Sequence, residues 1–165
     1  MSSLFVFVPC LPPPMHARCR CPGSFGVQLA KALGAKVTAT CSPRNFELVR
    51  GLGADEVVDY RTTDWGTELA GRNFDVVYDC IGGRAHWVGA TKVLKPGGQF
   101  VTIVGDEPSL GLSSLLSKGV GIATRQRFLS GFHYHLITAF PDGAILAEIA
   151  QLVDEGRISP VVDSV

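Results

Sequence analysis

Several properties that would direct this sequence toward a particular partner are missing. Its 165 residues include 15 basic and 15 acidic side chains, so the formal net charge is +0 and the isoelectric point is near 6.9. A neutral chain has no general electrostatic attraction to nucleic acid or to an anionic membrane surface. No apolar run approaches the length of a membrane span. We therefore expect neither a nucleic-acid partner nor a membrane span.

Cysteine is present, but without the spacing of a metal site or a disulfide framework. The five cysteines include no C-x-x-C pair, and their odd number argues against complete pairing. A reducing compartment is therefore expected, the cytoplasm first, with mitochondria left open. Cys19 and Cys21 lie beside Arg18 and Arg20, whose charges would lower a thiol pKa, so a reactive thiol pair is the less favoured alternative.

The first residues lack the pattern of a targeting signal. Residues 4–8 are apolar, but no basic residues precede them as they do in a secretory signal. Pro12, Pro13 and Pro14 would interrupt the amphipathic helix of a mitochondrial presequence. The sequence therefore favours neither kind of signal.

A complete glycine-rich phosphate turn is also missing, although the chain has 19 glycines. Residues 23–40 predict a helix and then a short β-branched strand, as found after the phosphate-binding turn of a dinucleotide fold. Against the pattern G-x-G-x-x-G only Gly23 and Gly26 match, and Cys21 stands at the first glycine position. The helix N-terminus at Gly23 and Ser24 would still offer N–H groups to a phosphate. The sequence thus predicts a nucleotide-binding fold with an altered pyrophosphate loop.

The chain does contain a regular alternation of strand and helix patterns. Strands are predicted at residues 36–40, 56–60, 74–81, 99–104 and 132–140, and helices at 24–33, 43–52, 64–70, 86–94 and 144–155. Ser24 is the expected N-cap of the first helix, and residues 95–98 are an expected tight turn. This alternation predicts the α/β class with a doubly wound parallel sheet (Rossmann-like), whose ligand crevice lies at the carboxyl ends of the strands.

Short segments along the chain together resemble one known family. They are VQLAKALGA at 27–35, LGAD at 52–55, VDY at 58–60, FDVVYD at 74–79, LKPGG at 94–98 and LVDEGRISP at 152–160. In their order and spacing they resemble the medium-chain dehydrogenase/reductase superfamily, specifically its zinc-independent quinone oxidoreductase-like branch. That resemblance implies a cofactor domain from which hydride passes directly from nicotinamide to substrate, with no catalytic nucleophile.

The resemblance also implies how the chain is divided. Residues 23–156 match the dinucleotide-binding domain and residues 157–165 an extended return segment, whereas the GroES-like barrel of the family is missing. The match thus indicates a cofactor domain truncated at both ends. Residues 1–22 are atypical: residues 4–8 are favoured as the first strand, and an unrelated or mis-assembled start is the alternative.

The end of the second predicted strand bears on the choice of cofactor. NAD enzymes usually place an acidic residue there for the ribose 2′-hydroxyl, whereas this chain has Ser42 and then Arg44. A hydroxyl and a guanidinium suit a phosphate, so NADP(H) is favoured, and the resemblance adds Tyr60 as a phosphate contact. The alternative is that Ser42 only caps the helix that begins at Pro43.

Two glycine-containing segments complete the expected cofactor contacts. Gly82 and Gly83 would let the backbone approach the cofactor ribose, although turn geometry alone also explains them. By resemblance, Val104 and Gly105 would lie near the nicotinamide.

Two residue pairs could indicate other chemistry. His133 and His135 share a strand face, but no carboxylate accompanies them, so no metal site is predicted. Asp75 and Asp79 also share a strand face, and paired carboxylates can act as acid and base. The resemblance instead implies a structural or ribose-side role for Asp79.

The favoured function is the NADPH-binding domain of a quinone or enone oxidoreductase-like protein that acts on a small carbonyl or quinone, with impaired activity in this chain. The first alternative is a non-catalytic Rossmann-fold remnant that binds or dimerises, with a second copy as partner in a homodimer. The second is a methyltransferase that uses S-adenosylmethionine, since residues 74–78 and 94–98 resemble segments of that fold. It is disfavoured because no acidic residue follows the second strand.

Overall fold

The structure is a computed structural model and describes residues 3–7, 21–103, 131–137 and 142–161. Its strands are β1 (Ser3–Phe7), β2 (Lys36–Cys41), β3 (Glu56–Asp59), β4 (Phe74–Asp79), β5 (Leu94–Thr102) and β6 (Phe132–Leu136). Its helices are α1 (Cys21–Ala32), the 3-10 helix η1 (Pro43–Asn45), α2 (Phe46–Gly51), α3 (Trp65–Glu68), α4 (Arg84–Val93) and α6 (Gly143–Asp154).

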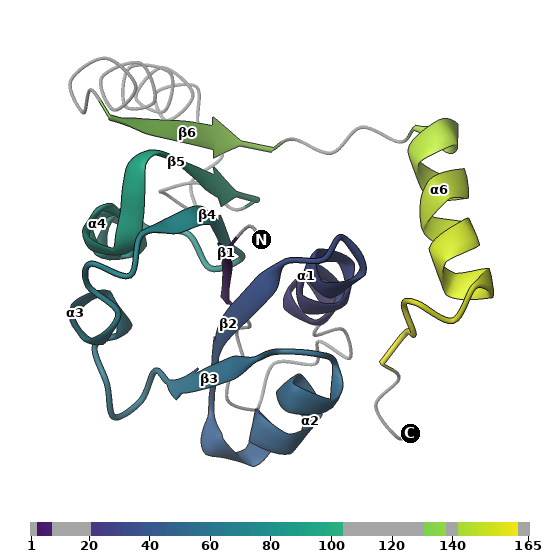
Figure 1. Ribbon diagram of the computed structural model, residues 1–165, viewed down its shortest axis with the longest axis horizontal. Helices are drawn as coiled ribbons and strands as arrows, with labels where there is room; N and C mark the ends of the chain where they lie inside the picture. The colour runs from purple at the N-terminus through teal and green to yellow at the C-terminus, as the bar shows by residue number, and fades with distance from the viewer. Residues whose placement is uncertain (1–2, 8–20, 104–130, 138–141, 162–165) are drawn as a thin grey trace, which may run out of the picture.

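The six strands form one parallel sheet in the order β3-β2-β1-β4-β5-β6 (Figure 1). The chain moves outward from β1 to β3 and then returns to place β4 on the other side of β1. This reversal is the topological switch of a doubly wound sheet, and ligands bind outside the carboxyl ends of the strands at such a point. The Rossmann-like α/β fold predicted from the alternation is confirmed.

Helices α1 and α2 cover one face of the sheet. Val37, Ala39 and Cys41 alternate along β2 and turn their side chains to this face, where they contact Val27 of α1 and Val49 of α2. All five are buried. The opposite side chains of β2 therefore face the other layer, because successive strand residues point to opposite sides.

Helices α3 and α4 cover the other face with larger side chains. Trp87 of α4 meets Phe100 of β5 and Tyr134 of β6 edge-on, with ring centroids 5.2 Å apart in each pair. Edge-to-face contacts of this kind add to the stabilisation that burial provides. This aromatic cluster fixes β5 and β6 against α4 and so supports the outer half of the sheet.

Helices α3 and α4 also approach each other closely at two glycines. A Cβ atom on Gly66 would lie 2.8 Å from Gly89 Cα, and a Cβ atom on Gly89 would lie 2.7 Å from the Trp65 ring. Neither position has room for a methyl group, so the close contact between the two helices requires glycine at both.

Some element boundaries differ from the sequence prediction. Helix α1 begins at Cys21, so Ser24 lies inside its first turns and is not an N-cap. Strand β5 begins at Leu94, because Leu94 already pairs with Phe74 of β4. The tight turn expected at 95–98 is therefore part of an irregular strand, in which Gly97 has a φ of 74°.

The apolar spacing of the predicted helix at 144–155 places Leu146, Ile149, Ala150 and Val153 on an inward face. This prediction is wrong for α6 in the structure described. Leu146 is 59% exposed, and no residue of α6 is buried. After the helix, Arg157 donates to the Ala32 carbonyl of α1, and Ser159 exchanges two hydrogen bonds with the Gln28 amide, at 2.7 and 3.0 Å. Figure 1 accordingly shows α6 standing apart from the sheet, beyond α1.

Candidate cofactor site

The candidate site lies along the carboxyl edge of the sheet. Strands β2, β3 and β4 end at Cys41, Asp59 and Asp79, and Cys41 is paired directly opposite Asp59. Because all strands are parallel, the segments that follow them meet at one edge. Three sequence-predicted cofactor regions, those at residues 42–44, 60 and 82–83, are brought to this edge.

Two hydroxyls at the end of β2 are buried without a hydrogen-bond partner. Thr40 and Ser42 are both 0% exposed, and within the described part of the chain neither Oγ1 of Thr40 nor Oγ of Ser42 has a hydrogen-bond partner. Thr38, two residues earlier on the same face, instead donates to Glu56 Oε2 at 3.5 Å. An unsatisfied buried hydroxyl costs about 1–3 kcal/mol, and native proteins leave few such groups without a reason.

Ser42 does not act as a helix cap. Its side chain makes no capping hydrogen bond at η1, and only its carbonyl accepts from the Asn45 N–H, at 2.9 Å. Arg44 is exposed on η1. The nearest carboxylate by strand register is that of Asp59, which accepts from the Arg61 N–H at 2.9 Å. The end of β2 therefore has two enclosed hydroxyls, with the exposed Arg44 two residues after Ser42, while Asp59 Oδ1 already accepts from the main chain.

A pocket of about 260 Å³ lies beside this edge, and Tyr60, Trp65, Ile81 and His86 are among the residues that line it. We call it the Tyr60–His86 pocket. The rings of Trp65 and His86 meet edge-on, with centroids 6.3 Å apart. Small-molecule sites usually have volumes of roughly 300–1,000 Å³, so this pocket would hold one ring system rather than a whole dinucleotide.

The turn after β4 depends on its two glycines. Gly82 and Gly83 have φ angles of 80° and 97°, a region that side chains with a Cβ rarely adopt. Gly83 is also the N-cap residue of α4. The geometry of the turn therefore accounts for both glycines, and their contact with a cofactor ribose stays a prediction.

The two aspartates of β4 do not form a catalytic pair. Asp75 and Asp79 are four positions apart on the strand, a distance of roughly 13 Å at about 3.3 Å per residue. Asp75 forms an ion pair with Lys95, whereas Asp79 is 0% exposed and hydrogen-bonded to the turn that follows it. The interpretation of Asp79 as a structural residue fits this geometry better than acid/base chemistry.

The first turn of α1 contains Gly23 and Ser24, both buried. N–H groups in the first turn of a helix have no partner within the helix, although Pro22 has no N–H to offer. Gly23 thus lies near the helix end where a phosphate could be received. Ser24 already has an interaction partner, and its contact with a phosphate stays a prediction. The predicted nicotinamide contacts at Val104 and Gly105 lie outside the described residues, as does the altered loop at 8–20.

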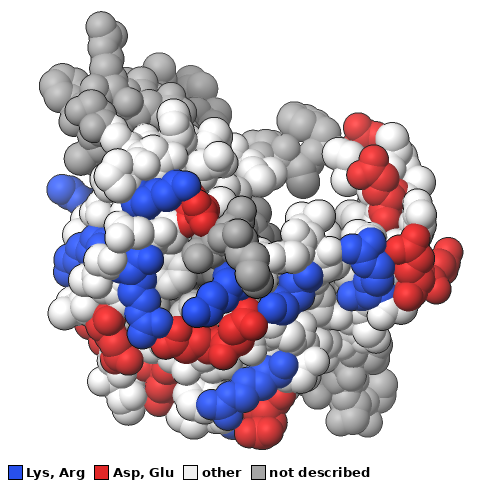
Figure 2. Space-filling view, in the orientation of Figure 1, with Lys and Arg blue, Asp and Glu red and all other residues white. Residues whose placement is uncertain are grey.

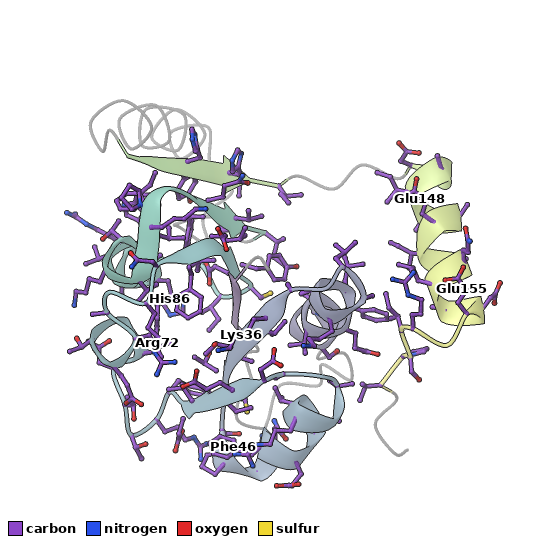
Figure 3. All side chains as sticks on the ribbon, viewed as in Figure 1. Lys36, Phe46, Arg72, His86, Glu148 and Glu155 are labelled. Carbon is purple, nitrogen blue, oxygen red and sulfur yellow. The ribbon has the colours of Figure 1, made fainter. Side chains whose placement is uncertain are left out.

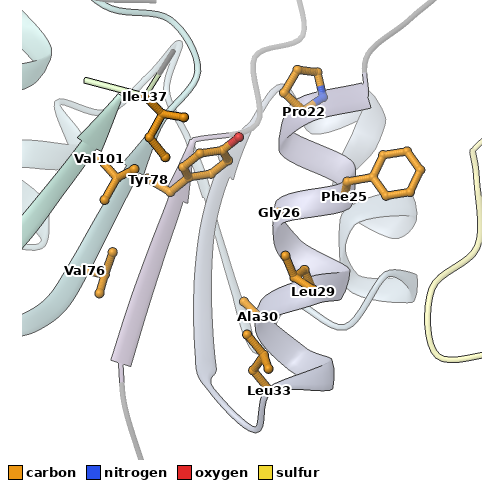
Figure 4. A pocket seen from close by; sticks show the side chains of 10 residues that line it. All are labelled: Pro22, Phe25, Gly26, Leu29, Ala30, Leu33, Val76, Tyr78, Val101 and Ile137. Atoms are coloured by element: carbon orange, nitrogen blue, oxygen red, sulfur yellow. The ribbon is translucent and has the colours of Figure 1, made fainter. Parts of the chain in front are cut away.

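A second, apolar cavity lies between α1 and the strands β4 and β5 (Figure 4). It measures about 440 Å³, with Phe25 and Leu29 on the helix side and Val76, Tyr78 and Val101 on the sheet side. Burial raises the pKa of the Tyr78 hydroxyl above its ordinary value. The described residues that line this cavity therefore offer a hydrophobic wall and no group that ionises near neutral pH.

Cys80 follows β4 but is not a reactive thiol. Burial raises its pKa to about 12, and the nearby Asp79 charge acts in the same direction. The thiolate is the nucleophilic form, so this thiol is inert near neutral pH. The alternative thiol pair at Cys19 and Cys21 cannot be compared, because Cys19 lies outside the described residues.

Charges and metal-binding side chains are dispersed. Figure 2 shows acidic and basic side chains interspersed over the face in view. His133 and His135 are exposed on β6 with stacked rings, 6.4 Å between centroids. Among the described residues, no group of three or more His, Cys, Asp or Glu side chains is arranged to hold a metal. In the described part of the chain, no helix has the length and apolar character needed to cross a membrane.

Sequence reasoning missed two residues, Thr40 and His86, that the structure brings to the site. The sequence pattern identifies Thr40 only as part of the end of β2. Whether its buried hydroxyl has a hydrogen-bond partner depends on spatial neighbours, which the alternation of strand and helix patterns cannot identify. Asp79 and His86 are linked by a contact of 3.1 Å. The spacing of seven residues across a strand, a turn and a helix gave no signal for this pair. His86 lies on the α3–α4 side of the sheet (Figure 3).

These features define a dinucleotide-type crevice in a doubly wound sheet, and comparison with known proteins gives the family. The family model described as zinc-binding dehydrogenase matches residues 52–165. The chain belongs to this family, and within it to the quinone oxidoreductase-like members of the medium-chain dehydrogenase/reductase superfamily. The family resemblance noted in the sequence is confirmed.

Individual relatives give the extent of the similarity. The chain is 38% identical over 154 residues to the mitochondrial NAD(P)H oxidoreductase RTN4IP1 of Danio rerio, covering 87% of this chain and 39% of that protein. It is 33% identical over 145 residues to the chloroplastic quinone-oxidoreductase QR1 of Triphysaria versicolor, covering 86% and 41%. The chain thus spans about two fifths of the length of these relatives.

Solved structures share the fold. The Escherichia coli quinone oxidoreductase complexed with NADPH superimposes with a TM-score of 0.64 at 24% identity, over 98% of this chain and 48% of that one. The quinone oxidoreductase of Coxiella burnetii gives a TM-score of 0.68 at 20% identity, over 94% and 42%. At sequence identities below 25%, this structural similarity establishes the fold of the chain but not which ligand it binds.

Proposed function

We propose that this chain binds NADPH at the carboxyl edge of its sheet, as the cofactor domain of an oxidoreductase that transfers hydride to a quinone or another small carbonyl compound. The observation that carries the proposal is the pair of buried, unpartnered hydroxyls of Thr40 and Ser42. They lie at the strand end where a nicotinamide dinucleotide is distinguished by its ribose substituent.

The choice of NADPH over NADH rests on the chemistry of that strand end. A phosphate offers acceptor oxygens to both hydroxyls, and the Arg44 guanidinium could add a charge-assisted hydrogen bond. An acidic residue would instead repel the phosphate, and none follows β2 directly. Both hydroxyls are enclosed, so the phosphate must displace the atoms that cover them.

The remaining residues would take supporting roles. Gly23 and Ser24 at the start of α1 would receive a phosphate, Tyr60 would contact the 2′-phosphate, and Gly82 and Gly83 would lie along a ribose. The nicotinamide supplies the hydride when the cofactor is bound. No described residue is required as a nucleophile, so the task of this chain is to bind and orient the cofactor.

Binding is expected to be weak because the glycine turn for the pyrophosphate is altered. The family relatives are also longer than the segment that this chain matches, so we propose substrate turnover only for a protein that supplies the rest of the substrate site. The cytoplasm is the proposed compartment, and the mitochondrial relative makes mitochondria the alternative. A homodimer is the proposed assembly.

Fluorescence titration tests the cofactor proposal. Trp65 and Trp87 are buried on the face beside the pocket, so bound cofactor should quench their emission or accept their energy. We expect saturable binding of NADPH, weaker binding of NADH, and loss of the difference in Ser42→Ala and Arg44→Ala. A chain that responds to neither nucleotide, or that responds to S-adenosylmethionine instead, would overturn the proposal. Equal responses to NADPH and NADH would overturn the choice of cofactor.

A further inference from the structure

The carboxylate of Asp79 is buried at the carboxyl end of β4 and is surrounded by hydrogen-bond donors. Its Oδ1 accepts from the Ile81 N–H at 3.0 Å and from His86 Nδ1 at 3.1 Å. Its Oδ2 accepts from the Gly82 N–H at 2.9 Å and from Thr102 Oγ1 at 3.1 Å. We call these four contacts the Asp79 clasp.

The four contacts of the clasp fill all the hydrogen-bond acceptor positions of the Asp79 carboxylate. An ionised carboxylate offers about four acceptor positions, and four donors occupy them. A buried carboxylate without such donors would be strongly unfavourable, so these contacts allow the charge to remain inside the sheet edge. With its acceptor positions filled, Asp79 has none left to take a proton from a substrate.

The clasp joins three parts of the molecule. Ile81 and Gly82 belong to the turn with left-handed backbone angles, Thr102 ends β5, and His86 lies in the first turns of α4. The main chain adds a further link, since the Asp79 carbonyl accepts from the Ile103 N–H at 3.2 Å. One side chain therefore sets the turn at the candidate site relative to the neighbouring strand and helix.

The clasp also sets the protonation pattern of one ring. An ionised carboxylate can only accept, so the His86 nitrogen that faces Asp79 must carry a proton. His86 lines the Tyr60–His86 pocket, where its ring meets the edge of Trp65. Asp79 thus determines both the orientation and the tautomer of a residue at the pocket wall.

We propose that Asp79 is the positioning residue of the cofactor crevice: it holds the backbone N–H groups of Ile81 and Gly82 in the turn after β4 and fixes His86 with a protonated Nδ1 at the wall of the pocket. The inference rests on the proposed binding of NADPH at this edge. Asp79 itself would not touch the cofactor, and its effect would pass through the turn and the ring.

The substitution Asp79→Asn tests this arrangement with little change in shape. The amide retains one acceptor oxygen, while its NH₂ group must face either the Ile81 or the Gly82 N–H. Asp75→Asn is the matched control, because Asp75 lies on the same strand but forms a surface ion pair with Lys95. The three chains are compared by melting temperature, NADPH titration and NMR.

We expect Asp79→Asn to bind NADPH roughly tenfold or more weakly, which corresponds to about 1.4 kcal/mol, and Asp75→Asn to bind like the wild type. Amide hydrogen exchange at Ile81 and Gly82 should quicken only in Asp79→Asn. Nitrogen chemical shifts of the His86 ring should show a protonated Nδ1 in the wild type and a changed tautomer population in that variant. Should Asp79→Asn fail to fold, Thr102→Val removes one donor and is expected to weaken NADPH binding by roughly threefold.

The outcomes separate this inference from the proposed function. Wild-type chain that does not bind NADPH overturns the proposed function itself. Wild-type binding with unchanged affinity in a folded Asp79→Asn variant overturns only the positioning role. An unprotonated His86 Nδ1 in the wild type also overturns it, because the clasp requires a donor at that atom.

Discussion

The substitution Thr40→Val should stabilise the ligand-free chain while weakening its affinity for NADPH. The Thr40 hydroxyl is buried without a partner, so the folded state bears the cost of removing it from water, about 1–3 kcal/mol. Valine places a methyl group in nearly the same space and suits a β-strand equally well. We therefore expect a gain of about 1 kcal/mol or more in the free energy of unfolding, which raises Tm by roughly 2–4 °C per kcal/mol for a chain of this size.

Thr38→Val is the matched control for this experiment. Thr38 lies on the same face of the same strand and is also buried, but its hydroxyl donates to Glu56. Removing that hydroxyl takes away one donor of Glu56 Oε2, which keeps its ion pair with Arg72, so Thr38→Val should be neutral or slightly destabilising. Thermal unfolding of both variants, followed by NADPH titration, gives the comparison. A Thr40→Val variant that is less stable than the wild type would show that the hydroxyl has a partner, and unchanged NADPH affinity would show that the cofactor does not use it.

Three further predictions concern other parts of the structure. Gly89→Ala should destabilise the chain by about 1–3 kcal/mol in thermal or urea unfolding, because the added Cβ would lie 2.7 Å from the Trp65 ring. The hydrogen bond from the Val37 N–H lowers the pKa of Asp55 below its ordinary value of 3.8. The ionised Asp55 carboxylate therefore stabilises the folded chain above pH 3.8, and this stabilisation is lost as the pH falls through the lowered pKa. In a comparison of unfolding free energy against pH, Asp55→Asn should lack that part of the pH dependence. Cys80 should react with a thiol reagent at pH 8 only after unfolding, since burial raises its pKa to about 12, and rapid reaction in the folded chain would contradict this.

The sequence alone was sufficient for the fold class and for the approximate location of the site. Alternating strand and helix patterns give a doubly wound parallel sheet almost without other information, because period-2 and period-3.6 patterns reflect which side chains are buried. Once that topology is known, residues after the strands must meet at one edge. Ser42, Tyr60 and Gly82 could therefore be assigned to one crevice, although none is near another in the chain.

Element boundaries and the orientation of α6 could not be read in the same way. The segment at 95–98 has the composition of a turn, but pairing of Leu94 with Phe74 begins β5 before it. The apolar spacing of α6 predicts an inward face, yet this part of the chain is hydrogen-bonded to α1 through Arg157 and Ser159, which lie beyond the end of α6. Both outcomes depend on contacts between residues distant in sequence.

By itself the sequence determined the alternation of strands and helices, the absence of an acidic residue directly after β2, and the family to which the chain belongs. The tertiary structure decided which polar groups at the sheet edge are satisfied. Thr38 and Thr40 are both threonines on the same strand face, but among the described residues only the Thr38 hydroxyl has a hydrogen-bond acceptor within reach. Asp75 and Asp79 likewise share a strand, but only Asp79 collects four donors, which come from as far along the chain as Thr102. Local propensity cannot make these distinctions, because hydrogen bonding and desolvation depend on neighbours that only the folded chain brings together.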